Sequence, residues 1–189
     1  RKTRREDAEL IQHVDLLRGA FESIRDTVKH LLDLNRPGRE LKQAVNLNKT
    51  IEDTLALVRG HLRKSNVTVR LDLATDMPSI IVSPQQMGQV FLNLINNAVE
   101  AMTGLSVHDT GMKQQTFFGG EISITTLAMA ERVVIAFADN GPGIPPEEVP
   151  RLFRPFHTTR RGGTGLGLAL VHRVIEAHGG TIRVEGRPG

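Results

Sequence analysis

Residues 93–98 read Asn93-Leu-Ile-Asn-Asn97-Ala, and residues 139–144 read Asp139-Asn-Gly-Pro-Gly-Ile144. A third segment follows them in order, Gly162-Gly-Thr-Gly-Leu-Gly-Leu168. Together they predict a nucleotide site. The first places amide ligands for a metal on a helix, and the second places a carboxylate that can bind a base at a strand end. The third is a glycine-rich turn that opens a helix toward phosphates.

The composition narrows the class of protein. The chain has 189 residues, 39% of them hydrophobic, enough for one domain of ordinary size plus an extra element. Aromatic residues make up only 4%, and the net charge of +3 is mild, so we expect no nucleic-acid partner. There is no cysteine and therefore no disulfide framework or thiolate chemistry.

The chain has no run of about 18 apolar residues and no apolar signal region. We therefore expect a cytoplasmic location, with membrane contact only through segments outside this chain. The first residue is Arg1 rather than Met, so we expect a piece of a longer protein, whose full length could be anchored in an inner membrane.

Residues 6–35 predict one long helix with an apolar seam. The seam alternates steps of four and three residues: Leu10, Val14, Leu17, Phe21, Ile24, Val28 and Leu31. This spacing is typical of a helical bundle or coiled coil, and the helix should end near Asn35, before Pro37. We expect dimerisation through residues 6–36. The alternative, an amphipathic helix packed on its own domain, stays open.

The remaining pattern predicts an α/β domain. Helices are expected at 48–64, capped by Asn48, at 84–102, capped by Ser83, and at 166–178, ended by Gly179-Gly180. Strands are expected at 67–73, 121–126, 132–138 and 181–185, with a short apolar run at 80–82. Residues 103–120 predict a long loop. Residues 145–164, which have no clear period, predict a mobile lid.

Asn93 and Asn97 are one helical turn apart, so their side chains share a face. Amide oxygens suit Mg²⁺, although both residues could instead simply bind loop backbone. Asp139 at a strand end can accept a hydrogen bond from an adenine amino group, yet the same residues also suit an ordinary tight turn. The glycines at 162–167 favour phosphate at a helix start, or else form a hinge. Arg160 and Arg161 precede them and could reach a phosphate tail.

These segments, with Leu152-Phe153-Arg-Pro-Phe156, resemble the N, G1, F and G2 boxes of sensor histidine kinases, in the same order. The resemblance covers residues 45–189 and implies the catalytic ATP-binding domain, a two-layer sandwich of a mixed sheet with helices on one face. Residues 1–38 resemble the second helix of the dimerisation hairpin. The wider family includes Hsp90, MutL and gyrase B.

The resemblance implies roles for individual residues. Asn97 would bind Mg²⁺ with Asn93 beside it, Asp139 would bind the adenine amino group, and Phe153 and Phe156 would anchor the lid. Arg160 and Asn93 would serve catalysis. The remaining nucleotide contacts would come from Gly141, Gly143, Ile144, Thr164, Gly165, Leu166 and Gly167.

The implied activity is transfer of the ATP γ-phosphoryl group to a histidine, and then to an aspartate of a response regulator. Related ATPases carry a glutamate where this chain has Asn93, and an amide cannot activate water. Two departures stand out. No histidine here fits the acceptor motif, and the chain stops at Gly189, before the family's usual last strand. The alternatives are a Ser/Thr or anti-sigma-type kinase of the superfamily and a dimeric ATP-binding scaffold.

Overall fold

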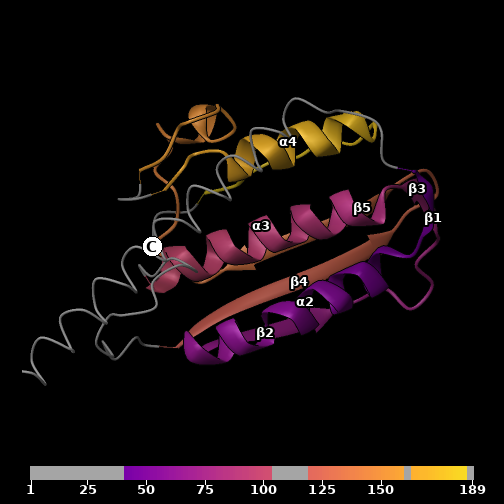
Figure 1. Ribbon diagram of the computed structural model, residues 1–189, viewed down its shortest axis with the longest axis horizontal. Helices are drawn as coiled ribbons and strands as arrows, with labels where there is room; N and C mark the ends of the chain where they lie inside the picture. Colours follow the sequence, from indigo (N-terminus) through magenta and orange to yellow (C-terminus); the bar gives the residue numbers. More distant parts are fainter. Residues whose placement is uncertain (1–40, 104–118, 160–162, 187–189) are drawn as a thin grey trace, which may run out of the picture.

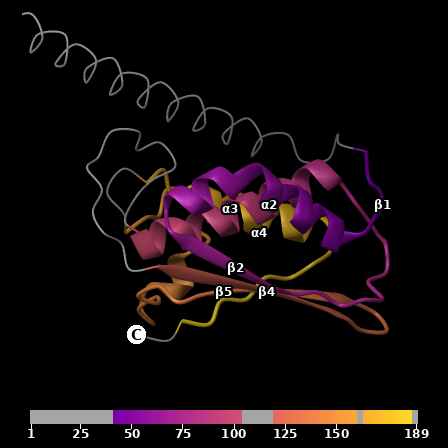
Figure 2. The ribbon, with the colours of Figure 1, turned by 90° about the horizontal axis from the view of Figure 1, so that it is seen from below.

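The computed structural model describes residues 41–103, 119–159 and 163–186. The predicted seam in residues 6–35 and most of the predicted loop at 103–120 lie outside these ranges. Three helices, α2 (Leu47–Lys64), α3 (Pro84–Thr103) and α4 (Gly167–Ala177), cover one face of a sheet, as Figures 1 and 2 show from two sides. The predicted α/β sandwich is therefore confirmed.

The main sheet is mixed, with strand order β2-β4-β5. Strand β2 (Val67–Asp72) runs parallel to β4 (Gly120–Ala128), and β4 forms an antiparallel hairpin with β5 (Val133–Asp139). The register places Asp139 opposite Ile122, near the start of β4. The carboxylate expected to bind a base therefore lies at the open end of the hairpin, where β5 ends and β4 begins.

A second, two-stranded sheet pairs β1 (Gln43–Val45) with β3 (Ile80–Val82) in antiparallel fashion. The sequence predicted the apolar run of β3 but not β1, because three residues are too few to show a period. Pairing identifies β1 as a strand, with Ala44 opposite Ile81. This small sheet closes the end of the molecule where α2 begins (Figure 1).

The core lies between the helices and the sheet. Ile122 and Ile124 of β4 point from the sheet toward the helices and are fully buried. Phe91 of α3 stacks on Phe137 of β5, with ring centroids 5.8 Å apart. Buried side chains from all three helices meet these residues; they are Ile51, Val58, Ile95, Val99, Leu170 and Val171. Because α3 contacts both strands of the hairpin and α4, it fixes the position of everything it carries.

The ends of the helices confirm some predictions and correct others. Ser83 caps α3, since its Oγ accepts from the backbone N of Gln86 at 3.2 Å. The cap of α2 is Asn46, whose side chain accepts from Asn48 N and Lys49 N, and not Asn48 as predicted. The Asn48 side chain is instead bound across the fold, donating to Ala74 O at 2.8 Å.

The predicted final strand at 181–185 is wrong, because residues 181–186 form no regular secondary structure. Among the described residues, no backbone hydrogen bond joins this segment to β5. Alternation of Ile182 and Val184 with polar residues predicted a strand, and Ile182 does pack on the core, but no ladder forms. The predicted stop of α4 is confirmed: Gly179 has φ +74°, and Gly180 N donates to Ile175 O.

Candidate functional site

Asn93 and Asn97 of α3 face the first turn of α4. A Cβ placed on Gly167 would lie 3.2 Å from Asn93 Oδ1 and 3.9 Å from Asn97 Nδ2. Asn93 Nδ2 donates to Gln89 O of its own helix at 2.9 Å, and its Oδ1 lies toward Gly167. Tertiary packing therefore brings the first and third of the predicted segments together. Asn93 donates to its own helix rather than to a loop, and the alternative that these residues bind loop backbone stays open for Asn97.

The donor set suits a hard cation held by few protein ligands. Among the residues described by the structure, no group of three His, Cys, Asp or Glu side chains could hold a metal. A divalent ion here would rest on amide oxygens and on the phosphates of a nucleotide, which is the usual arrangement for Mg²⁺. The Asn97 atom nearest Gly167 is Nδ2, and a half-turn of that amide would present Oδ1 in its place.

Asp139 is the last residue of β5, and one of its two carboxylate oxygens already accepts a hydrogen bond within the protein. Its Oδ1 accepts from Gly141 N at 3.0 Å, and the residue is exposed. A Cβ on Gly141 would lie 2.6 Å from that oxygen and 3.4 Å from Met102 Cγ, so a side chain at position 141 would force the Asp139 carboxylate out of this position. The second carboxylate oxygen has no partner among the described residues and is available to a donor such as an exocyclic amine.

Asn140 ties the backbone that follows Asp139 to the start of β4, a role that the sequence did not reveal. Its side-chain Oδ1 accepts from Glu121 N at 2.8 Å, and its backbone N donates to Glu121 O at 3.2 Å. The Asn140 side chain thus extends the hairpin ladder past its last regular pair. Asp and Asn commonly bond to nearby backbone in turns, which was the available signal.

The turn after Asn140 continues through Gly143, whose φ of +76° favours glycine. Ile144 then meets the last described segment, because a Cβ on Gly186 would lie 2.5 Å from Ile144 O. Gly186 therefore lies directly against the predicted base-binding turn. It was not among the predicted site residues, since its contact depends on how the chain returns after α4.

The glycine-rich turn before α4 is built on close backbone approach. Gly165 has φ +64°, its O accepts from Phe156 N at 2.9 Å, and a Cβ there would lie 2.5 Å from Phe156 C. Thr164 Oγ1 accepts from Leu166 N at 3.4 Å. The Leu166 side chain is fully buried, so only its backbone can face a ligand. Leu166, the N-cap residue of α4, makes no side-chain cap, so within the described residues the first N–H groups of the helix are available to an anion.

Residues 145–159, the longer described stretch of the predicted lid, pack on α4 through the aromatic side chain of Phe153. The ring of Phe153 lies 5.1 Å from that of His172, as an anchor should. Phe156 is 66% exposed, so its expected role as a second anchor is wrong. His157 Nε2 donates to Glu148 Oε2 at 2.6 Å and closes the segment on itself around the short helix η1 (Val149–Arg151).

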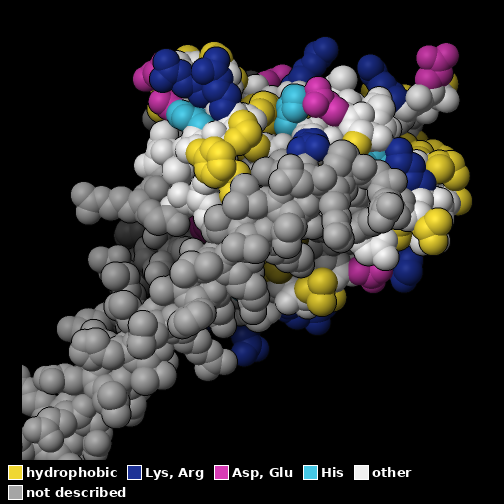
Figure 3. Space-filling model, turned by 45° about the horizontal axis from the view of Figure 1, so that its top comes forward, with side chains coloured by type: hydrophobic (Ala, Val, Ile, Leu, Met, Phe, Trp, Pro, Cys, Tyr) yellow, Lys and Arg dark blue, Asp and Glu magenta, His cyan; other side chains and the backbone are white. Residues whose placement is uncertain are grey.

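Basic side chains gather over this segment, as the upper left of Figure 3 shows. Arg151 and Arg154 are both exposed there. Arg160, predicted to serve catalysis, and Arg161 lie outside the described residues, so their positions stay predictions. Motion of the lid likewise stays a prediction.

Comparison with known proteins places this geometry in a family. Residues 82–189 match the model of the "Histidine kinase-, DNA gyrase B-, and HSP90-like ATPase" family. The chain is 32% identical to sporulation kinase E of Bacillus subtilis over 94% of its own length, which is 22% of that kinase. It is 34% identical to sensor histidine kinase ZraS of Escherichia coli K12 over 89% of its length, or 33% of ZraS.

Solved structures agree with the sequence comparison. The nucleotide-free catalytic domain of histidine kinase ThkA is 29% identical, with a TM-score of 0.61 over 72% of this chain and 81% of that domain. A complex of ThkA with its response regulator shares the fold, at 24% identity and a TM-score of 0.69 over 92% of this chain and 48% of that one. Within the described ranges, none of the helices combines the length and the apolar composition that a membrane span requires. The chain belongs to the histidine kinase, DNA gyrase B and HSP90-like ATPase family, and its relatives by sequence include a sporulation kinase and sensor histidine kinases.

Proposed function

We propose that this chain is the ATP-binding catalytic part of a two-component sensor histidine kinase. The chain spans only 22% and 33% of the two curated relatives, so the activity of the whole protein is part of the proposal. The observation that carries it is the contact between Gly167 at the start of α4 and Asn93 and Asn97 on α3. It joins a phosphate-type helix start to amide ligands, which suits a Mg-nucleotide.

Each end of the site has its own task. Asp139 would accept a hydrogen bond from the adenine amino group, and Gly141, Gly143 and Ile144 would line the base. Gly165, Gly167 and the backbone at Thr164 and Leu166 would face the phosphates. Asn97 and Asn93 would hold Mg²⁺, which neutralises phosphate charge when bound. Glycine at these positions supports the proposal, because a Cβ at 141 or 167 would press on the Asp139 carboxylate or on Asn93 Oδ1, and one at 165 would clash with the backbone of residues 156 and 157.

The chemistry expected is group transfer rather than hydrolysis. Asn93 carries no group that titrates, so it cannot take a proton from water. Positioning and charge neutralisation would then drive transfer of the γ-phosphoryl group to a histidine on a partner helix. The final acceptor would be an aspartate of a response regulator. The complex of ThkA with its response regulator supports that class of partner. The proposal has three further parts. Residues 1–38 form part of a dimerisation hairpin and residues 45–189 form the catalytic domain. Two chains dimerise through residues 6–36, and the protein acts in the cytoplasm.

Calorimetry on the Asp139→Asn variant tests the adenine end. The amide presents a donor toward the amino group, and an unmatched buried pair costs about 1–3 kcal/mol, so ATP and adenosine should bind more weakly. Inorganic triphosphate should bind as it does to the parent chain, because Asp139 lies at the other end of the site. Equal losses for ATP and triphosphate would contradict the assignment.

A second experiment separates a kinase from a dimeric scaffold that only binds ATP. The chain is mixed with labelled Mg-ATP and a helix that carries an acceptor histidine. Acid-labile phosphate on the added helix is expected, and none on His13 or His30 of this chain. A chain that binds ATP but never labels any acceptor helix would be the scaffold.

A further inference from the structure

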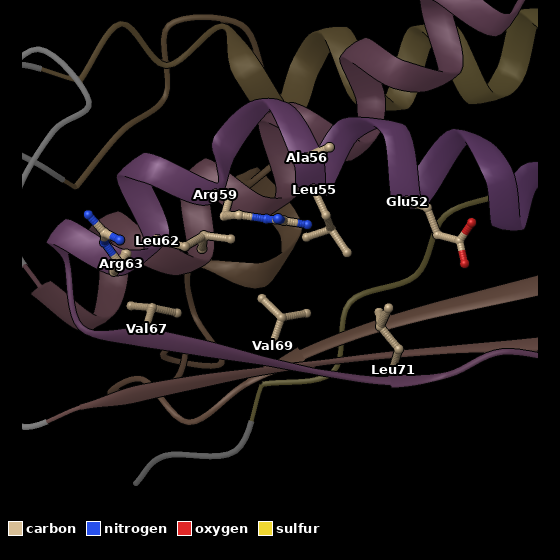
Figure 4. A pocket seen from close by; sticks show the side chains of 9 residues that line it. All are labelled: Glu52, Leu55, Ala56, Arg59, Leu62, Arg63, Val67, Val69 and Leu71. Atoms are coloured by element: carbon tan, nitrogen blue, oxygen red, sulfur yellow. The ribbon is translucent and has the colours of Figure 1, made fainter.

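A groove separates α2 from β2 on the side of the molecule away from the nucleotide site. Its apolar floor comes from Leu55 of α2 and from Val69 and Leu71 of β2. Figure 4 shows Arg59 lying along the groove above Val69, with Arg63 at one end and Glu52 at the other. We call this the α2–β2 groove. None of these residues belongs to the predicted nucleotide site.

The sheet side of the groove is an open edge. Among the described residues β2 pairs with β4 alone, so its other edge presents unpaired N–H and C=O groups. Val67, Val69 and Leu71 alternate toward the groove, and Leu71 is still 42% exposed. Side chains of an added strand would meet this apolar face at every second position.

The charges of the groove are uneven along its length. Arg63 lies at the Val67 end, Arg59 lies above Val69 in the middle of the groove, and Glu52 lies toward the Leu71 end; all three are exposed. In the described part of the chain none of the three forms an ion pair. An occupant with carboxylates over the stretch from Val67 to Val69 would match both arginines, and it would avoid Glu52 at the other end.

We propose that the α2–β2 groove binds an extended segment of a partner protein as an added strand on β2. The segment has apolar residues at alternate positions, which fill the groove over Val69 and Leu71. Acidic residues at one end engage Arg59 and Arg63. This surface is separate from the nucleotide site, so the inference stands or falls independently of the proposed kinase activity.

The test uses synthetic peptides that match β2 in length and alternate valine with threonine. Two carry aspartates, at either the amino or the carboxyl end, to allow for both strand directions. Two further peptides carry lysines in those positions. Binding to the full 189-residue chain is measured by fluorescence anisotropy, and amide exchange locates the peptide.

We expect one acidic peptide to bind at least about tenfold more tightly than its lysine counterpart and to slow exchange at residues 67–72. Arg63→Glu should reverse that order. Arg132→Glu, an equal charge change on the exposed hairpin turn, should not alter it. Unchanged circular dichroism spectra and urea midpoints verify that both variants fold.

Three results would overturn the proposal. The peptides could leave exchange at residues 67–72 unchanged, or acidic and basic peptides could bind wild type and Arg63→Glu alike. Sedimentation could also show that the chain self-associates without peptide and that Arg63→Glu abolishes this. The occupant would then be a second copy of the chain rather than a partner segment.

Discussion

Replacing Gly167 with alanine should weaken nucleotide binding while leaving stability intact or raised. The added methyl group would lie 3.2 Å from Asn93 Oδ1, so Asn93 or the first turn of α4 must shift by a few tenths of an ångström. If the shift breaks one hydrogen bond to a bound phosphate, the cost is about 1–2 kcal/mol, or roughly five- to thirtyfold in Kd. Alanine also favours helix over glycine, by up to about 1 kcal/mol.

The assay compares two variants with wild type by calorimetry with Mg-ATP and by urea denaturation. Gly60→Ala is the matched control, because Gly60 lies inside α2 with no atom within 4 Å of an added Cβ. It should gain about 0.5–1 kcal/mol of stability and bind Mg-ATP as wild type does. If Gly167→Ala binds as tightly as Gly60→Ala, or loses stability and affinity together, the claimed contact with Asn93 does not govern the site.

Three further predictions concern stability and motion. Thr126→Val should cost about 1–3 kcal/mol of unfolding free energy in a denaturant titration. The reason is that the buried Thr126 Oγ1 donates to Asn48 Oδ1 and accepts from Ala74 N, both at 2.9 Å. The control is Thr125→Val, which should be nearly neutral because Thr125 has no such bonds within the described residues. Burial, and then the charge of Lys64, lower the pKa of His61 below its usual 6.5. The unfolded chain therefore takes up this proton at a higher pH than the folded chain, and stability should fall as the pH drops below about 6.5. His61→Gln should flatten that fall, and an unaltered pH profile of stability would exclude His61 as its source. Amide exchange at residues 145–159 should be fast in the nucleotide-free chain and slower with Mg-ATP. Slow exchange at the same rate with and without nucleotide would identify a fixed loop rather than a lid.

Most helices and strands could be predicted from the sequence because neighbouring residues are enough to favour each of them. Ser83 before Pro84 is a strong helix start, and the alternation in residues 67–72 suits a strand with one buried face. Where prediction was wrong, a distant partner decided the outcome. Asn48 and Asn46 are equally good caps by sequence, but the bonds of Asn48 to Ala74 and Thr126 leave Asn46 as the cap of α2.

Phe153 and Phe156 show the same division within the lid segment. Both are large and apolar, so sequence alone suggested two anchors. The backbone at Phe156 has φ +65°, where Phe156 N meets Gly165 O, and its side chain is left exposed, while Phe153 reaches His172. A sequence pattern cannot predict the left-handed backbone conformation of Phe156, because a contact with the turn before α4 imposes it.

By itself the sequence determined the chemistry and order of the nucleotide motifs, the helix starts and the alternation of the strands, since each depends on residues within one or two turns of chain. Only the tertiary structure decided that Gly167 lies against Asn93, that Gly186 backs the turn at Ile144, and that residues 181–186 do not join the sheet. These contacts join segments far apart in the chain. They form only when the apolar faces of α3, α4 and the β4–β5 hairpin pack into one core.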